Sequence, residues 1–196
     1  MAESPLHAFL KKLGVAFLVN QGCFLVDTEV PLGRLGSSHE LDGHHVIDAC
    51  GVGERFFRPR ERSLSDFLGG RRDYEVKRNV LRGVEVKVSR SDFRNGFVCS
   101  CCNFNYLLTP MRLVAPWEVP SGVGLIEYNR HKFTVEQDGE EGFRFRGLRV
   151  VRKAAYRGLR QHQIDNATAR IARNSSRMSV SALESELRRM HSDIQG

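Results

Sequence analysis

Two short stretches of this chain place acidic side chains inside otherwise apolar, strand-like sequence. Asp48 lies in the run Val46–Val52, and Glu85 and Lys87 alternate with valines in Gly83–Val88. A period of two puts Glu85 and Lys87 on one face of a strand while the valines enter the core. If the two strands pair, Asp48 faces Glu85, and neighbouring carboxylates repel unless a cation lies between them. The sequence therefore predicts a site for Mg²⁺ or Mn²⁺, which prefer oxygen ligands.

The chemistry expected of such a site is phosphodiester hydrolysis. A divalent ion there would bind a scissile phosphate, acidify a water molecule and stabilise the leaving oxygen. Lys87 would point at the same place and supply positive charge to the transition state. Glu29, on a preceding strand-like stretch, could add a carboxylate. Glu-x-Lys alone is a common pattern on the wet face of a strand, whereas a carboxylate inside an apolar run such as that of Asp48 is costly without a partner.

The order of several segments resembles the PD-(D/E)XK nuclease superfamily. These segments are Asp48, Glu85–Phe93, Tyr106–Pro110 and Gly122–Glu127. The resemblance covers roughly Pro5 to Tyr128 and is closest to small, single-domain repair-type members, in which Ser-x-x-Asp-Phe follows the E-x-K motif. Ile47 stands where the name-giving proline would be, and Asp66 or Asp73 remains an alternative to Asp48 because the connection to Glu85 is long.

This resemblance implies an α/β fold: a restriction-endonuclease-like core with a central mixed β-sheet flanked by helices. It also implies that Asp48, Glu85 and the carbonyl of Val86 hold the metal ion. Lys87 and Glu29 would complete the catalytic group.

Hydrophobic periodicity predicts the elements that position these residues. Pro5–Asn20 is expected to be a helix capped by Ser4, since apolar residues recur at helical spacing. The expected strands are residues 21–30, 105–110, 122–128, 132–137 and 143–151.

The chain is expected to divide into a nuclease-like core, residues 1–151, and a basic helical C-terminal appendage, residues 152–196. Within the core, residues 56–82 are rich in arginine and poor in apolar periodicity, which predicts a mobile basic insertion. The insertion would be either a flap that grips phosphates or a solvated linker. The appendage would lie along nucleic acid or mediate self-association, so a homodimer is an open alternative.

A net charge of +7 over 196 residues and a pI near 9.5 favour a polyanionic partner, and DNA is the expected one. The expected DNA-binding residues are Arg34, Arg71, Arg72, Lys77, Arg78, Arg90, Arg94, Arg170 and Arg173. No stretch has the length and apolarity of a membrane span, so we expect a cytoplasmic protein with no membrane partner.

The five cysteines are expected to be reduced thiols. Cys99, Cys101 and Cys102 offer an alternative, structural Zn²⁺ site, although their spacing lacks the usual two-residue gap. Trp117 is expected to pack within a proline-containing loop.

The sequence thus favours a metal-dependent DNA endonuclease, acting in DNA repair, recombination or the processing of mobile-element or phage DNA. The main alternative is a catalytically inactive nuclease-fold module that binds DNA or a partner protein, and a zinc-stabilised interaction protein is a third. Nothing in the sequence selects duplex, nicked, branched or single-stranded DNA, or RNA.

Overall fold

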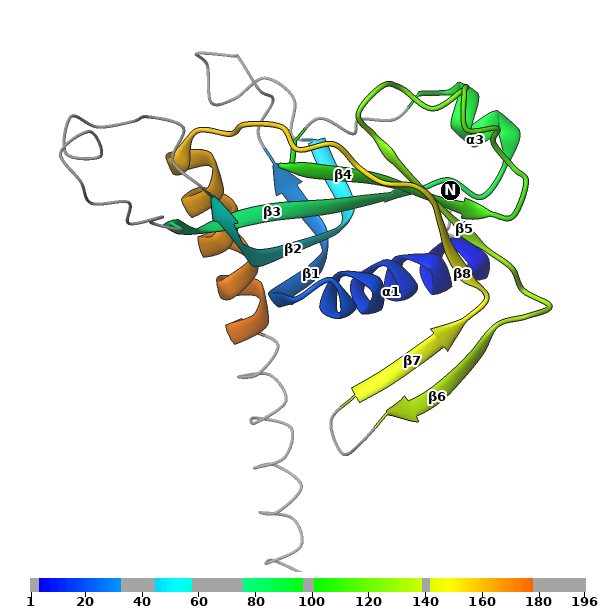
Figure 1. The fold of residues 1–196 in the computed structure, drawn as a ribbon, viewed down its shortest axis with the longest axis horizontal. Coiled ribbons are helices and arrows are strands. Elements are labelled where there is room, and N and C mark those ends of the chain that lie inside the picture. The colour runs from blue at the N-terminus through cyan, green and yellow to red at the C-terminus, as the bar shows by residue number, and fades with distance from the viewer. Residues whose placement is uncertain (1–3, 33–44, 58–75, 97–100, 139–141, 178–196) are drawn as a thin grey trace, which may run out of the picture.

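A central mixed sheet organises the chain. The computed structural model describes residues 4–32, 45–57, 76–96, 101–138 and 142–177 (Figure 1). The sheet has six strands in the order β1-β2-β3-β4-β5-β8. Their bounds are β1 Cys23–Leu32, β2 His45–Phe57, β3 Val76–Val86, β4 Phe104–Pro110, β5 Gly124–Tyr128 and β8 Leu148–Arg152.

The strand directions bring three carboxyl ends to one edge of the sheet. Strands β1, β2 and β3 pair antiparallel, β3, β4 and β5 pair parallel, and β8 returns antiparallel to β5. The parallel strands β3, β4 and β5 therefore end side by side. This edge is where open α/β sheets bind ligands, because loops and helix ends meet there.

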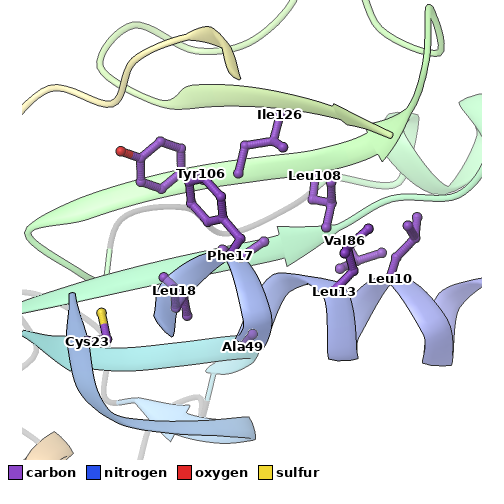
Figure 2. Close-up of a cluster of buried hydrophobic side chains, with 11 residues drawn as sticks. Leu10, Leu13, Phe17, Leu18, Cys23, Ala49, Val86, Tyr106, Leu108 and Ile126 are labelled. Carbon is purple, nitrogen blue, oxygen red and sulfur yellow. The ribbon is translucent and has the colours of Figure 1, made fainter. Parts of the chain in front are cut away.

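Helix α1, Pro5–Asn20, covers one face of the sheet, as the sequence predicts. Ser4 caps it by accepting a hydrogen bond from the His7 amide at 3.2 Å, and Pro5 occupies the first turn. Its apolar side packs on β2, β3 and β4, with Leu10, Phe17 and Leu18 buried (Figure 2). Val84 and Val86 of β3 face this helix, whereas Leu81 is buried on the opposite side of the sheet.

The C-terminal segment differs from its predicted role as an appendage. Strand β8 extends to Arg152, and a helix over residues 161–177 packs on the face opposite α1 (Figure 1). Ile164, Ala167 and Ile171 are buried against β1, β2 and β3 at spacings of three and four residues. That stripe is narrow and includes an alanine, so the surrounding arginines obscured it. The described part of this segment belongs to the core.

The two ends of the segment 56–82, which the sequence predicts to be a mobile insertion, are strand. Phe57 pairs with Val76 and Arg55 with Arg78, so both ends of that segment are ladder-paired strand. Lys77 and Arg78 are exposed, which explains the missing apolar alternation. Residues 58–75 lie outside the described residues.

One predicted strand, residues 143–151, is two strands. Gly147 separates β7, Gly142–Arg146, from β8, with a φ of 79°. A Cβ at this position would lie 2.7 Å from the Phe133 amide nitrogen, so the turn requires glycine. Strand β7 pairs with β6, Thr134–Asp138, in a separate hairpin.

Burial of Ile171 predicts that the C-terminal helix stabilises the whole fold. Ile171→Ala is expected to lower the free energy of unfolding by about 2–5 kcal/mol, because it leaves a cavity against β1 to β3. Chemical denaturation measures the change. Arg173→Ala, at an exposed position of the same helix, is the control and should shift it by less than about 0.5 kcal/mol. Equal effects of the two substitutions would contradict this packing.

Candidate active site

Asp48 and Glu85 meet at the carboxyl end of β3. The β2–β3 ladder pairs Ala49 with Val84, which places the next residues, Asp48 and Glu85, opposite each other. Asp48 Oδ2 accepts a hydrogen bond from the Val86 amide at 2.8 Å. The carboxylate therefore takes the place of a strand carbonyl, and this bond fixes its position beside Glu85.

A pocket of about 430 Å³ opens at this point, between the first turn of α1 and the short helix α3, Arg90–Arg94. Its lining residues are Ser4, His7, Asp48, Glu85, Val86, Lys87, Val88 and Asp92. The structure thus brings together Asp48, Glu85 and Lys87, the three residues around which the sequence predicts a site.

Lys87 lies between two carboxylates. Its Nζ is 3.5 Å from Glu85 Oε1 and 3.3 Å from Asp92 Oδ1, and its side chain is 13% exposed. Ser89 is the N-cap of α3 and accepts from the Asp92 amide, while Asp92 Oδ2 accepts from the Val88 amide. Asp92 therefore helps to start α3 and also orients the ammonium group.

Two basic residues of α1 reach the site, and neither was predicted from the sequence. His7 Nε2 lies 3.6 Å from Asp48 Oδ1, and Lys11 Nζ lies 3.9 Å from the same oxygen. His7 and Lys11 are four residues apart, so they share one side of the helix. The sequence did contain one signal for this contact, because Lys11 is a charged residue within an otherwise apolar helix. In the structure Lys11 is only 8% exposed.

Glu29 is linked to the site indirectly. Its Oε1 accepts from Lys11 Nζ at 2.6 Å, but Glu29 does not line the pocket and its side chain is 63% exposed. Its backbone has a φ of 53°, which a residue with a Cβ rarely adopts. The catalytic role expected of Glu29 stays a prediction, and its contact with Asp48 passes through Lys11.

Burial and mutual repulsion raise the pKa values of both acids. The pKa of Glu85 rises to about 7, chiefly because burial disfavours the charged form, and the Asp48 charge raises it further while Lys87 opposes the shift. Burial also raises the pKa of Asp48, against the hydrogen bond from Val86 and the charges of His7, Lys11 and Lys87. Four carboxylates, those of Glu29, Asp48, Glu85 and Asp92, face the ammonium groups of Lys11 and Lys87. A divalent cation would offset the excess of carboxylates over ammonium groups.

The oxygen atoms available to such a cation are those of Asp48, Glu85 and the Val86 carbonyl, a donor set that suits Mg²⁺ or Mn²⁺. Across the described ranges, no three His, Cys, Asp or Glu side chains are grouped closely enough to hold a metal ion by themselves. Backbone and water ligands would have to complete the coordination.

Those of the expected DNA-binding residues that the structure describes are spread over β3, α3 and the C-terminal helix. Arg34, Arg71 and Arg72 lie outside the described residues. Lys77 pairs with Glu54, and it lies at the opposite end of β3 from Glu85, roughly 25 Å away for a strand of this length. Arg78 and Arg173 are exposed, and Arg170 donates to the Pro31 carbonyl, so Arg170 anchors the C-terminal helix to β1.

Near the pocket, α3 carries Arg90 and Arg94, and both are exposed. Arg90 donates to both Glu118 oxygens, at 2.7 and 2.8 Å, and to the Leu113 carbonyl. These bonds from Arg90 hold the pKa of Glu118 down at about 2. Arg90 is therefore engaged in attaching α3 to the β4–β5 connection.

Trp117, in that connection, differs from its predicted packing. The loop itself packs, with Val114 and Val119 buried, but the Trp117 side chain is 85% exposed. Arg152 holds the loop by donating to four carbonyls, those of Pro116, Val119, Pro120 and Val123.

The cysteines of the alternative zinc site lie partly in the core. Cys101 and Cys102 are buried, and the Cys102 and Cys50 sulfur atoms are 3.9 Å apart. Cys99 lies outside the described residues, as do Asp66 and Asp73, so both alternatives stay predictions.

Comparisons with known proteins assign no family. No family model matches the sequence, and no curated protein matches it. A solved structure similar to this chain is SPO1766, a protein of unknown function from Silicibacter pomeroyi, at 18% identity and a TM-score of 0.48 over 88% of each chain. Among the described residues, no helix has the length and apolarity needed to span a membrane.

The raised pKa of Glu85 predicts a pH-dependent stability in the metal-free protein. Folded Glu85 holds its proton up to about pH 7, whereas in the unfolded chain it ionises near 4.5. Its contribution to stability is therefore full below pH 4.5 and is lost as the pH rises to 7, a change of about 3 kcal/mol at most.

Urea denaturation in EDTA between pH 5 and 8 measures this contribution. The stability of Glu85→Gln relative to the wild type should rise across that interval. In Asp48→Asn the pH interval over which stability is lost should move to lower pH, because the Asp48 charge no longer raises the pKa of Glu85. If the difference in unfolding free energy between Glu85→Gln and wild type does not change with pH, Glu85 does not have a raised pKa in the folded protein.

Proposed function

We propose that this protein is a metal-dependent DNA endonuclease of the PD-(D/E)XK superfamily, with a restriction-endonuclease-like core. The observation that carries the proposal is the convergence of Asp48, Glu85 and Lys87 in one open pocket at the end of β3. The sequence resemblance gives these same three residues catalytic roles. The mixed sheet, with α1 on one face, agrees with the fold that the resemblance implies.

The charge of the pocket supports a divalent cation. Burial disfavours the ionised forms of Asp48 and Glu85, and the two negative charges also repel each other. A bound cation would lower the free energy of these charged forms. When bound, Mg²⁺ or Mn²⁺ supplies Lewis acidity toward a phosphate oxygen and lowers the pKa of water. Asp48, Glu85 and the Val86 carbonyl would hold it.

The remaining side chains of the pocket orient charge. The Val86 amide fixes Asp48 through Oδ2, while His7 and Lys11 approach the other oxygen. Lys87, positioned by Asp92, places an ammonium group beside Glu85, where a phosphate under attack would gain negative charge. Because Lys87 is 13% exposed, water screens that charge less than it would at the surface.

Cleavage of labelled DNA tests the proposal. With Mg²⁺ or Mn²⁺, the wild type should cut at least one member of a panel of single-stranded, duplex, nicked and branched DNAs. Glu85→Ala and Lys87→Ala should each lower the rate by about 100-fold or more, because each removes charge from the reacting centre. Glu54→Ala and Lys12→Ala remove the same residue types from exposed positions away from the pocket and should cut like wild type. Equal cutting by all five proteins would assign the activity to a contaminant, and binding without cutting would favour the inactive module.

Metal binding provides a separate test. Titration calorimetry should detect one Mn²⁺ site in the wild type and none in Asp48→Asn or Glu85→Gln. Affinity should weaken as the pH falls below 7, since a proton competes for Glu85. Unchanged Mn²⁺ binding by both variants would place the ion elsewhere. Zinc in the purified protein, with unfolding on chelation, would instead favour the cysteine site.

A further inference from the structure

A second pocket, of about 660 Å³, lies beside the candidate active site. Residues at the carboxyl ends of β4 and β5, including Pro110 and Tyr128, form part of its wall. Leu6 of α1 also lines it, and the next residue, His7, lines the acidic pocket. Strand β5 is two strands from β3 in the sheet, so the ends of these strands, which line the two pockets, are about 10 Å apart along the same edge.

The inner surface of this second pocket is apolar and partly rigid. Leu6 and Met111 line it and are 40% and 41% exposed, respectively. The Tyr128 ring packs against Phe9 and Phe133, with centroids 5.4 and 5.5 Å away. Tyr128 therefore offers an aromatic wall whose position is already fixed by its neighbours, which lowers the entropy cost of stacking a planar ligand on it.

The rim of the pocket is cationic. Arg112, Arg130 and Lys132 line it and are exposed, and its lining within the described chain includes no aspartate or glutamate. Arg112 has a φ of 62°, and the Glu127 carboxylate accepts a hydrogen bond from its amide at 3.0 Å. An unfavourable backbone conformation thus presents a cation at the rim, and such conformations cluster at binding sites.

An apolar, aromatic pocket with a positive rim is complementary to a nucleotide, whose base has an apolar face and whose phosphates are anionic. Its volume is within the range of small-ligand pockets, about 300–1,000 Å³. Paired bases inside a duplex are stacked on both faces and cannot enter such a pocket, whereas unpaired bases can.

We infer that this pocket binds an unpaired nucleotide of the DNA strand whose phosphodiester lies at Asp48 and Glu85. The inference rests on the proposed function and specifies its substrate class: DNA with a single-stranded segment next to the cleavage site. Stacked nucleotides rise about 3.4 Å each and unstacked ones are further apart, so the roughly 10 Å between the two strand ends corresponds to at most about three nucleotides.

Binding in EDTA tests the inference without cleavage. Fluorescence anisotropy compares a labelled oligothymidylate with a duplex of the same length. The wild type should bind the single strand more tightly. Arg130→Ala/Lys132→Ala should weaken single-strand binding about tenfold or more and lower the slope of log affinity against log salt by about 1.4, or about 0.7 for each phosphate that is no longer neutralised.

Two further variants separate the pocket from general charge effects. Lys12→Ala/Arg157→Ala removes two exposed cations outside the pocket and should change binding much less. Met111→Gln keeps the side-chain size but makes the wall polar, and it should weaken single-strand binding with no change in salt dependence. Equal or tighter binding of the duplex by wild type, or equal losses in the two double variants, would overturn the inference.

The outcomes also distinguish this inference from the proposed nuclease activity. If the protein cuts DNA but the pocket variants bind and cut single-stranded substrates like wild type, the inference fails and the nuclease stands. If the protein cuts nothing with Mg²⁺ or Mn²⁺ but the pocket variants lose single-strand binding, the nuclease fails and the binding site stands.

Discussion

The repulsion between Asp48 and Glu85 is the constraint on which the rest of the site depends. The sheet register places the two acids opposite each other, and burial raises the free energy of their ionised forms. The fold compensates with neighbours from three separate elements: the Val86 amide on β3, Lys11 on α1, and Lys87, which α3 positions through Asp92. A sheet edge that collects charges from several elements in this way is costly for a purely structural protein, and this cost is the physical reason to interpret it as a binding site.

The parallel part of the sheet determines what else lies close to these acids. Strands β3, β4 and β5 run parallel and end together (Figure 1). Residues far apart in sequence, such as Lys87, Pro110 and Tyr128, therefore lie at the same edge of the sheet. The antiparallel strands β1 and β8 complete the two sides of the sheet, and the buried face of α1 joins its middle strands. The pocket at Asp48 and Glu85 and the second pocket at Tyr128 thus both result from the parallel pairing of β3, β4 and β5.

Local pattern was sufficient to predict the parts of the fold whose burial follows a simple period. The alternation around Glu85 gave its strand and its face, and the apolar repeat of Pro5–Asn20 gave α1 with its Ser4 cap. The contributions of His7 and Lys11 were not predicted: Lys11 stands out as a charge in an apolar helix, but the rotation of α1 that brings both side chains to Asp48 is set by tertiary packing. The break between strands at Gly147 was missed, because both flanking segments have strand-like composition. The burial of the C-terminal helix was also missed, because Ala167 adds little to its apolar stripe.

The exposure of Trp117 affects how the protein can be observed. Trp117 is the chain's sole tryptophan, and its indole is surrounded by water while Arg152 holds the loop beneath it. Its emission should therefore already resemble that of an unfolded chain in the native state, so denaturation followed by tryptophan fluorescence will show little wavelength shift. A shift toward shorter wavelength in the folded protein would instead report that another molecule covers this loop.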